Sequence, residues 1–263
     1  MTDHNEYVQM TVTSGVKPLE LRYTPISDCY SKMPVAYRTA TRINSVAAGV
    51  LSPAEYAVSL EATREGIDLA CWNIAEAMRH LKVFEQAGRH VAYISVRCPV
   101  ALAANGRLEE TMQRLLTENH CGTPEKICLE FPPTILHHPT ETLRTAMLDM
   151  KLMHVRTMMS GCGGSDCPMA NLLAVPMERV LLTPTVTRLA GSRGDPTVLP
   201  SLVQYLHSMR VEILAEGAEN DAQIQVLNRA GCAGYIAADT YQGAAERSKR
   251  DMTLESAVAQ REE

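Results

Sequence analysis

The sequence predicts an α/β protein in which eight strands follow the order of a parallel barrel whose first strand is antiparallel. Two β-prone runs, 19–26 and 35–43, are separated by too few residues for a helical crossover, so they should pair antiparallel. Apolar residues then recur at helical spacing over 66–87, and strand-like and helix-like segments alternate from there to residue 239. Periodicity alone leaves an open doubly wound sheet as the alternative.

The remaining elements follow from the same pattern. In 66–87 the apolar residues are three or four positions apart, and Gly88 is a natural helix end. Strands are expected at 90–97, 126–131, 155–160, 179–184, 211–217 and 234–239. Helices are expected near 107–118, 140–153, 168–175, 198–209 and 220–230. The chain thus divides into a polar lead-in (1–18), a barrel domain (19–240) and a polar C-terminal helix or tail (241–263).

Composition narrows the class of protein. The 263 residues are 46% hydrophobic, enough for one large core, and the net charge of −5 is spread evenly. We therefore expect no nucleic-acid partner and no anionic membrane surface. No signal peptide or membrane-spanning run is visible, so we expect no membrane partner. The eight cysteines are scattered through apolar segments, which is typical of reduced thiols and favours a cytoplasmic location.

Several segments, in the same order, resemble the EAL family of cyclic di-GMP phosphodiesterases. They are YTPISD (23–28), AYRTATR (36–42), the AAGVLSPAEY, SLE and CWNI segments within 47–74, PEKICLEF (124–131), AEGAEN (215–220) and AGC (230–232). The resemblance covers about 19–240 and is most specific in the last two segments. It implies a TIM-like (β/α)8 barrel with the first strand antiparallel, and a Mg²⁺ or Mn²⁺ site at the C-terminal ends of the strands.

Carried over one at a time, most of the family's metal ligands fall on residues that do not bind a divalent cation. The signature Glu falls on Arg38, the Asn of the third strand on Arg97, and the paired aspartates on Ser160 and Gly161. The other departures from the family pattern are Pro133 for an acid, Leu181 and Thr183 for the Lys and Asp of one motif, and Ile236 for a Gln. A fixed cation ~4 Å from a metal ion costs ~4 kcal/mol per unit charge near a protein surface. We therefore expect no catalytic residue, no metal ion and no cofactor.

Three functional positions of the family are retained, namely Glu130, Glu216 and Arg42. The resemblance implies that Arg42 contacts a nucleotide phosphate, although it is equally typical of a structural arginine at a barrel rim. Arg38 and Arg97 should project into the same pocket as the two acids. We expect at least one of them to neutralise Glu130 or Glu216, because buried charges are normally paired. The alternative is that both arginines bind a ligand.

The segment SGCGGSDCP (160–168) follows a strand and precedes a helix. Its amides could cradle an anion, but a remodelled loop is the simpler interpretation of a lone glycine cluster. Cys162 and Cys167 could hold zinc, yet no second Cys/His pair with ligand spacing accompanies them. The adjacent His137 and His138 have diverging side chains. The sequence therefore predicts no metal site here.

These departures favour a catalytically inactive, EAL-type regulatory module that acts through protein–protein interaction in bacterial signalling. Its protein partner is unknown, and the loop 161–168 with the helix after it is the expected contact. A homodimer is a further expectation from the family tendency. The alternative is a receptor that binds cyclic di-GMP without hydrolysing it, with Arg42 and Glu216 among its contacts. An enzyme of a different chemistry ranks third.

Overall fold

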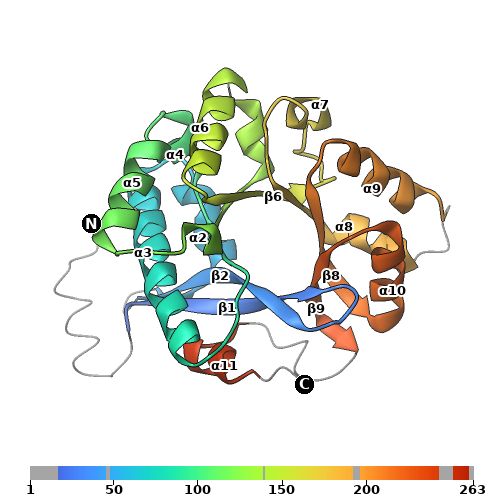
Figure 1. Cartoon of the computed structure of the whole chain (residues 1–263), viewed down its shortest axis with the longest axis horizontal. Coiled ribbons are helices and arrows are strands. Elements are labelled where there is room, and N and C mark those ends of the chain that lie inside the picture. Colours follow the sequence, from blue (N-terminus) through green and yellow to red (C-terminus); the bar gives the residue numbers. More distant parts are fainter. Residues whose placement is uncertain (1–16, 46–47, 139, 192–195, 243–250, 261–263) are drawn as a thin grey trace.

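The computed structural model of the chain describes residues 17–45, 48–138, 140–191, 196–242 and 251–260. Viewed along the barrel axis, the strands form a ring and the helices lie outside it (Figure 1). Among the described residues, no helix has both the length and the apolar character needed to cross a bilayer.

The predicted barrel with an inverted first strand is confirmed. The strands are β1 (Leu19–Asp28), β2 (Pro34–Ser45), β3 (Gly49–Leu51), β4 (Ile94–Arg97), β5 (Ile127–Phe131), β6 (Arg156–Cys162), β7 (Arg179–Leu182), β8 (Glu212–Asn220) and β9 (Gly234–Gln242). β1 pairs antiparallel with both β2 and β9, which closes the ring, and the other barrel strands pair parallel. The alternative of an open sheet is therefore wrong. Short β3 extends β2 outside the ring.

The helices match the predicted segments and add several short ones. They are α2 (Pro53–Leu60), α3 (Arg64–Gln86), α4 (Val100–Ala104), α5 (Leu108–Glu118), α6 (Thr140–Leu152), α7 (Met169–Leu172), α8 (Pro184–Thr187), α9 (Val198–Ser208), α10 (Asp221–Ala230) and α11 (Leu254–Ala259). Sequence periodicity did not predict α2, α4, α8 or β3, because each is too short to show a period. The strand predicted at 90–97 begins only at Ile94.

The barrel interior is filled in layers, as in parallel barrels generally. The middle layer is apolar and contains about one residue from each barrel strand or from the position just before the strand. Its members are Ile26, Ala36, Tyr93, Cys128, Met158, Leu181, Leu214 and Ile236. At the N-terminal ends of the parallel strands, the Arg179 guanidinium lies 4.7 Å from the centre of the Tyr93 ring and its Nε is 3.0 Å from Glu212 Oε1. The opposite end of the barrel carries the candidate site.

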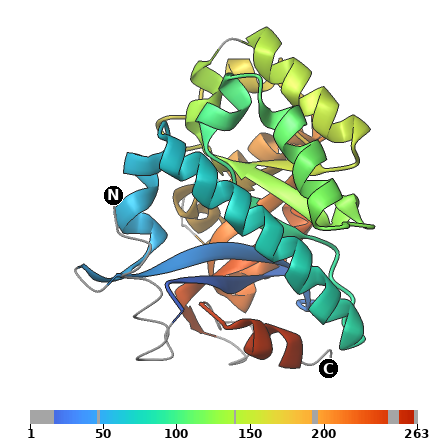
Figure 2. The same cartoon turned by 90° about the vertical axis from the view of Figure 1, so that its left-hand side faces the viewer.

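The C-terminal segment packs outside β1 and β2, beside the long helix α3 (Figure 2). Tyr23 and Met252 form a β-bridge, and the Tyr37 hydroxyl donates to the carbonyl oxygen of Ala257, 3.1 Å away. Within the segment 241–263, where a polar helix or tail is expected, the structure has the short helix α11, while 243–250 and 261–263 lie outside the described residues, as does 1–16 of the predicted lead-in. Residue 251 is thereby fixed near the barrel mouth.

Gly66→Ala is expected to destabilise the fold by about 1–3 kcal/mol through overpacking. α2 turns sharply into α3, and a Cβ at Gly66 would lie only 1.9 Å from the backbone oxygen of Leu60. This clash outweighs the ~1 kcal/mol that alanine gains over glycine in a helix. Urea unfolding measures the change. Gly122 is the matched control, because its Cβ would meet no atom within 4 Å; equal effects of the two alanines would contradict the prediction.

Candidate functional site

A cavity of about 370 Å³ opens at the C-terminal end of the barrel. Its charged floor comes from β2, β4, β5 and β8, and its wall from α2, the turn after it and the start of α3. The lining residues used below are Arg38, Glu61, Arg97, Glu130 and Glu216. Parallel barrels keep their ligand sites at this end, since the strand ends direct side chains from the whole ring toward one point. The cavity is therefore the candidate site.

Arg38 joins the two retained acids across the barrel mouth. Its Nε and Nη2 donate to the two oxygens of Glu130, at 2.9 and 2.5 Å, and its Nη1 donates to Glu216 Oε1 at 2.7 Å. Ser95 adds a hydroxyl donor to Glu130 at 3.1 Å. The exposed fractions of the side chains are 23% for Arg38, 2% for Glu130 and 20% for Glu216. The prediction that at least one arginine neutralises these acids is confirmed for Arg38.

This ion pair predicts that the fold loses stability in acid. Burial alone would raise the pKa of Glu130, but the charge and hydrogen bonds of Arg38 outweigh burial and lower it below its ordinary value. Protonation therefore favours the unfolded chain. The stabilisation is complete above the ordinary glutamate pKa of about 4.3 and is lost as pH falls through the lowered pKa of the folded chain.

Urea unfolding between pH 3 and 7 measures this effect. In the wild-type chain the free energy of unfolding should fall below about pH 4.3, and the fall should be smaller in Glu130→Gln. Glu118→Gln is the control, because Glu118 pairs with Arg114 on an exposed helix surface. If Glu118→Gln flattened the profile as much as Glu130→Gln, the loss would not come from the barrel mouth.

Arg97 has a different partner from the one expected. Its Nη2 lies 2.7 Å from Glu61 Oε2, and the other oxygen of Glu61 accepts from the backbone N–H of Val100 at 2.8 Å. Arg97 therefore holds the turn between α2 and α3 against the start of α4 through Glu61, and its charge also helps to lower the pKa of Glu130. Sequence reasoning missed Glu61 as a site residue, although it lies in the SLE segment that resembles the family pattern.

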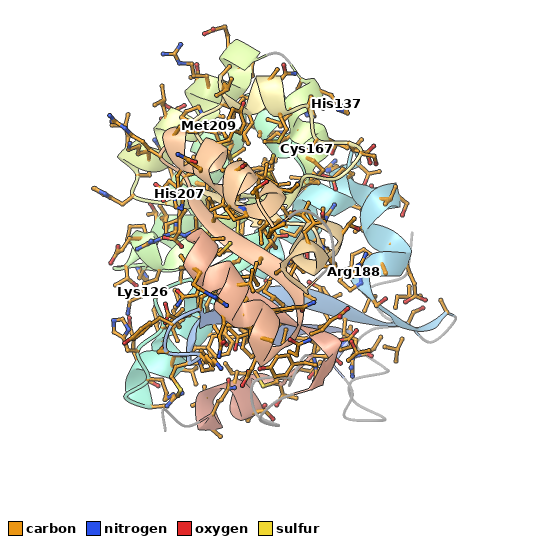
Figure 3. All side chains as sticks on the ribbon, turned by 90° about the vertical axis from the view of Figure 1, so that its right-hand side faces the viewer. Lys126, His137, Cys167, Arg188, His207 and Met209 are labelled. Carbon is orange, nitrogen blue, oxygen red and sulfur yellow. The ribbon has the colours of Figure 1, made fainter. Side chains whose placement is uncertain are left out.

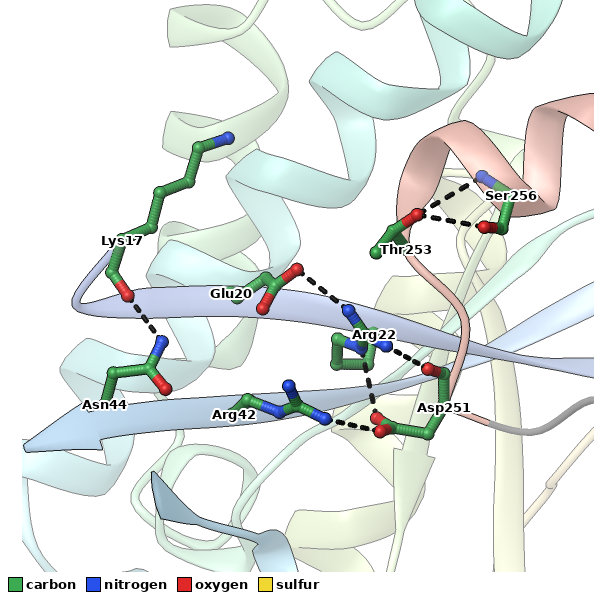
Figure 4. Close-up of polar contacts among 8 residues, drawn as sticks. All are labelled: Lys17, Glu20, Arg22, Arg42, Asn44, Asp251, Thr253 and Ser256. Carbon is green, nitrogen blue, oxygen red and sulfur yellow. Dashed lines mark hydrogen bonds and ion pairs between the residues drawn. The ribbon is translucent and has the colours of Figure 1, made fainter. Parts of the chain in front are cut away.

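Arg42 lies beyond the cavity, four residues after Arg38 on β2. Its Nη2 is 2.5 Å from Asp251 Oδ2, and Arg22 Nε is 3.1 Å from the other oxygen of Asp251 (Figure 4). The carboxylate of Asp251 thus binds the Arg42 guanidinium, which the family resemblance implies would contact a phosphate. No sequence signal pointed to Asp251, because it is placed by the β-bridge between Tyr23 and Met252.

The other residues that differ from the family pattern have packing, hydrogen-bonding or capping roles in the barrel. Leu181 and Ile236 are fully buried in the apolar middle layer. Ser160 is buried and its hydroxyl donates to the carbonyl oxygen of Phe131 at 3.3 Å. Thr183 caps α8 by accepting from the N–H of Val186. Gly161 has φ +72°, and a Cβ there would lie 3.1 Å from the ring of Pro133. None of these side chains can offer a carboxylate or an ammonium group to the cavity.

The residues at the strand ends do not fit the divalent cation that the resemblance implies. Glu130 and Glu216 offer oxygen atoms, but the guanidinium of Arg38 lies between them. A fixed positive charge there opposes a divalent cation by several kcal/mol. In the part of the chain that the structure describes, no three His, Cys, Asp or Glu side chains are grouped to hold a metal ion. The site is an ion-pair network.

Cys162 ends β6 and Cys167 lies in the loop after it, and both sulfurs contact Met169 Sδ. Among the described residues, no third Cys, His, Asp or Glu joins them in a metal-binding group. The interaction between the two thiols lowers the pKa of Cys167, whereas the same interaction and burial raise the pKa of Cys162. His137 lies in the 3-10 turn Pro133–His137 and joins no metal-binding group among the described residues.

Comparison with known proteins supports the fold and places the family. The EAL enzyme Bd1971 bound to cAMP and cyclic di-GMP has a TM-score of 0.79 at 17% identity, covering 96% of this chain and 67% of that one. The PaMucR phosphodiesterase in complex with cyclic di-GMP gives 0.78 at 18%, covering 95% and 97%. The FimX EAL domain from Pseudomonas aeruginosa bound to cyclic di-GMP gives 0.71 at 14%, covering 90% and 94%.

These identities are low, so the likeness to the solved structures shows the fold. No curated protein matches the sequence. The family profile described as EAL domain, however, matches residues 9–236, which is most of the chain. Together with the closed barrel, this match shows that the chain belongs to the EAL domain family of cyclic di-GMP signalling proteins.

Proposed function

We propose that this chain is a catalytically inactive EAL-type regulatory module that acts by binding another protein in bacterial signalling. The observation that carries the proposal is the Arg38 guanidinium, which bridges Glu130 and Glu216 where the family resemblance places metal ligands. Hydrolysis of a phosphodiester by the metal route needs a firmly held cation and a water that it activates. An arginine between the two acids supplies neither.

The cavity also lacks the other groups that this chemistry uses. The positions of the family's Lys and Gln are Leu181 and Ile236, which pack inside the barrel. Charge that develops on a phosphate in the transition state would therefore meet no ammonium group from β7. The barrel itself is kept closed and well packed, which is expected of a domain that works through its surface.

The contact surface that we propose consists of the loop 161–168, helix α7 and Leu173 directly after it. This loop follows β6, which carries Ser160 and Gly161 at the positions of the family's paired aspartates. Leu173, directly after α7, is 61% exposed. A large apolar side chain on a protruding loop is typical of residues that a partner covers. A protein bound to this surface would contact the end of β6, the strand that carries Ser160.

Three measurements test the proposal. Purified chain should not hydrolyse cyclic di-GMP above background with Mg²⁺ or Mn²⁺. Calorimetric titration with cyclic di-GMP should show no binding at micromolar concentration. Crosslinking and pull-down from the native host should capture a protein with the wild type but not with Leu173→Asp. Leu152→Asp is the matched control, because Leu152 is 79% exposed at the far end of α6.

The outcomes separate the candidate functions. Metal-dependent hydrolysis would overturn inactivity. Capture that is unaffected by Leu173→Asp would overturn the choice of surface. A self-associated chain, measured by light scattering and dispersed by Leu173→Asp, would identify the partner as a second copy.

The alternative function, a cyclic di-GMP receptor, rests on Arg42 and on the cavity beside it. The pair between Arg42 and Asp251 is well exposed and contributes about 0–1 kcal/mol, so a phosphate could displace Asp251. If the receptor function is correct, Asp251→Ala should tighten nucleotide binding and Arg42→Ala should abolish it. Unchanged or undetectable binding in both variants would exclude Arg42 as a phosphate contact.

A further inference from the structure

Three sulfur atoms meet where β6 ends and α7 begins. Cys162 is the last residue of β6, Met169 is the first residue of α7, and Cys167 lies in the loop between them (Figure 3 labels Cys167). The distance from Cys162 Sγ to Met169 Sδ is 4.0 Å, and that from Cys167 Sγ to Met169 Sδ is 3.7 Å. Met169 Sδ therefore contacts both thiols, and these two contacts form two sides of a triangle of sulfur atoms.

The loop backbone is shaped to bring the three sulfurs together. Gly163 has φ +82°, and a Cβ there would lie 2.6 Å from the Val186 side chain, so only glycine fits this turn. Backbone hydrogen bonds from Gly164 to Gly161 and from Cys167 to Gly164 then fold the loop back over β6. Cys162 is fully buried, whereas Cys167 is partly exposed and gives solvent access to the triangle.

We propose that Cys162, Cys167 and Met169 form a binding site for a soft monovalent metal ion, with Cu(I) as the preferred ion. Metal–thiolate bonds are about 2.3 Å long. An ion in the plane of three sulfurs at that distance sets them about 4 Å apart, which matches the two distances from Met169 Sδ to the cysteine sulfurs. Thiolate and thioether ligands together select Cu(I), because both are soft donors.

Harder ions fit this site less well. Structural zinc takes four Cys or His ligands, and among the described residues no His, Asp or Glu completes a group of three with these thiols. Binding is a ligand exchange without oxidation: two metal–thiolate bonds and one metal–thioether bond form, and up to two thiol protons are released to solvent. The bound ion would tie the loop 163–168 to both β6 and α7. This inference does not depend on the proposed function, because it concerns the triangle alone.

Anaerobic titration of the full, reduced chain with Cu(I), in competition with a chromophoric Cu(I) chelator, tests the site. One equivalent should bind tightly, and X-ray absorption should show only sulfur neighbours at about 2.3 Å. Met169→Leu keeps the volume of the side chain but removes the thioether, and should weaken binding about tenfold or more. Cys167→Ser should abolish the tight equivalent. Zn²⁺ should not compete at equal concentration.

The control is a second pair of neighbouring cysteines, Cys29 and Cys232, which are buried beside the start of β9, at the N-terminal end of the parallel strands and thus at the opposite end of the barrel from the mouth. Cys232→Ser should leave Cu(I) binding unchanged, and circular dichroism of each variant checks that it is folded.

The proposal would be overturned if the wild-type chain bound no equivalent of Cu(I) tightly. Loss of the tight equivalent in Cys232→Ser, or its persistence in Cys167→Ser, would also overturn it. Conversion of Cys162 and Cys167 to a disulfide by one equivalent of hydrogen peroxide, in a chain that takes up no Cu(I), would identify a redox pair instead.

Discussion

Arg38→Ala is expected to lower the free energy of unfolding by about 3–5 kcal/mol, the cost of breaking a buried ion pair from one side. Removing the guanidinium leaves the carboxylate of Glu130 buried, with hydroxyl donors such as Ser95 in place of the bound cation. Glu216 loses the same partner. At about 2–4 °C per kcal/mol for a chain of this size, the melting temperature should fall by roughly 10 °C.

Thermal and urea unfolding measure the change, and two other arginines supply the controls. Arg97→Ala and Arg42→Ala each break a more exposed ion pair, with Glu61 and Asp251, and should cost at most ~1 kcal/mol. A double-mutant cycle of Arg38→Ala with Glu130→Ala isolates the pair itself. If Arg38→Ala cost no more than the two controls, the network would not stabilise the barrel.

Much of the site could be predicted because strand ends in a parallel barrel converge. Arg38, Glu130 and Glu216 come from segments far apart in the sequence. Glu130 and Glu216 lie near the C-terminal ends of their predicted strands, and Arg38 lies in the first half of the predicted strand 35–43. Alternation of side chains along a strand places them on the inner face. The closed ring then brings them within hydrogen-bond distance, as the ion pairs show.

The partners of Arg97 and Arg42 could not be predicted in the same way. Glu61 lies in a turn after a helix too short to show a period, and its position depends on the close approach of Gly66 to Leu60. Asp251 belongs to a segment that reaches the barrel only through tertiary contacts of the C-terminal tail. Neither location follows from local periodicity, which is the signal that sequence reasoning uses.

The short elements were missed for a related reason. α2, α4 and α8 have eight residues or fewer, so their apolar positions cannot establish a helical repeat. α2 nevertheless forms one wall of the cavity. The sequence therefore predicted the floor of the site better than its walls.

Arg38→Glu is expected to make the stability of the chain depend on a divalent cation. The substitution places a third carboxylate beside Glu130 and Glu216, and like charges this close destabilise the fold more than Arg38→Ala does. Oxygen ligands from three strands are what a hard cation prefers. A cation present at about 100 times its dissociation constant would restore about 2.7 kcal/mol.

Thermal unfolding with and without Mg²⁺ or Mn²⁺ tests this expectation. The melting temperature of Arg38→Glu should rise with cation concentration, while that of the wild type should not change. Arg38→Gln is the matched control, because it removes the positive charge without adding a carboxylate and should not respond. Hydrolysis of cyclic di-GMP should remain absent, because Leu181 still supplies no positive charge and Ser160 no carboxylate. If the cation stabilised the wild type equally, Arg38 would not exclude the metal. The main argument for the proposed inactivity would then be wrong.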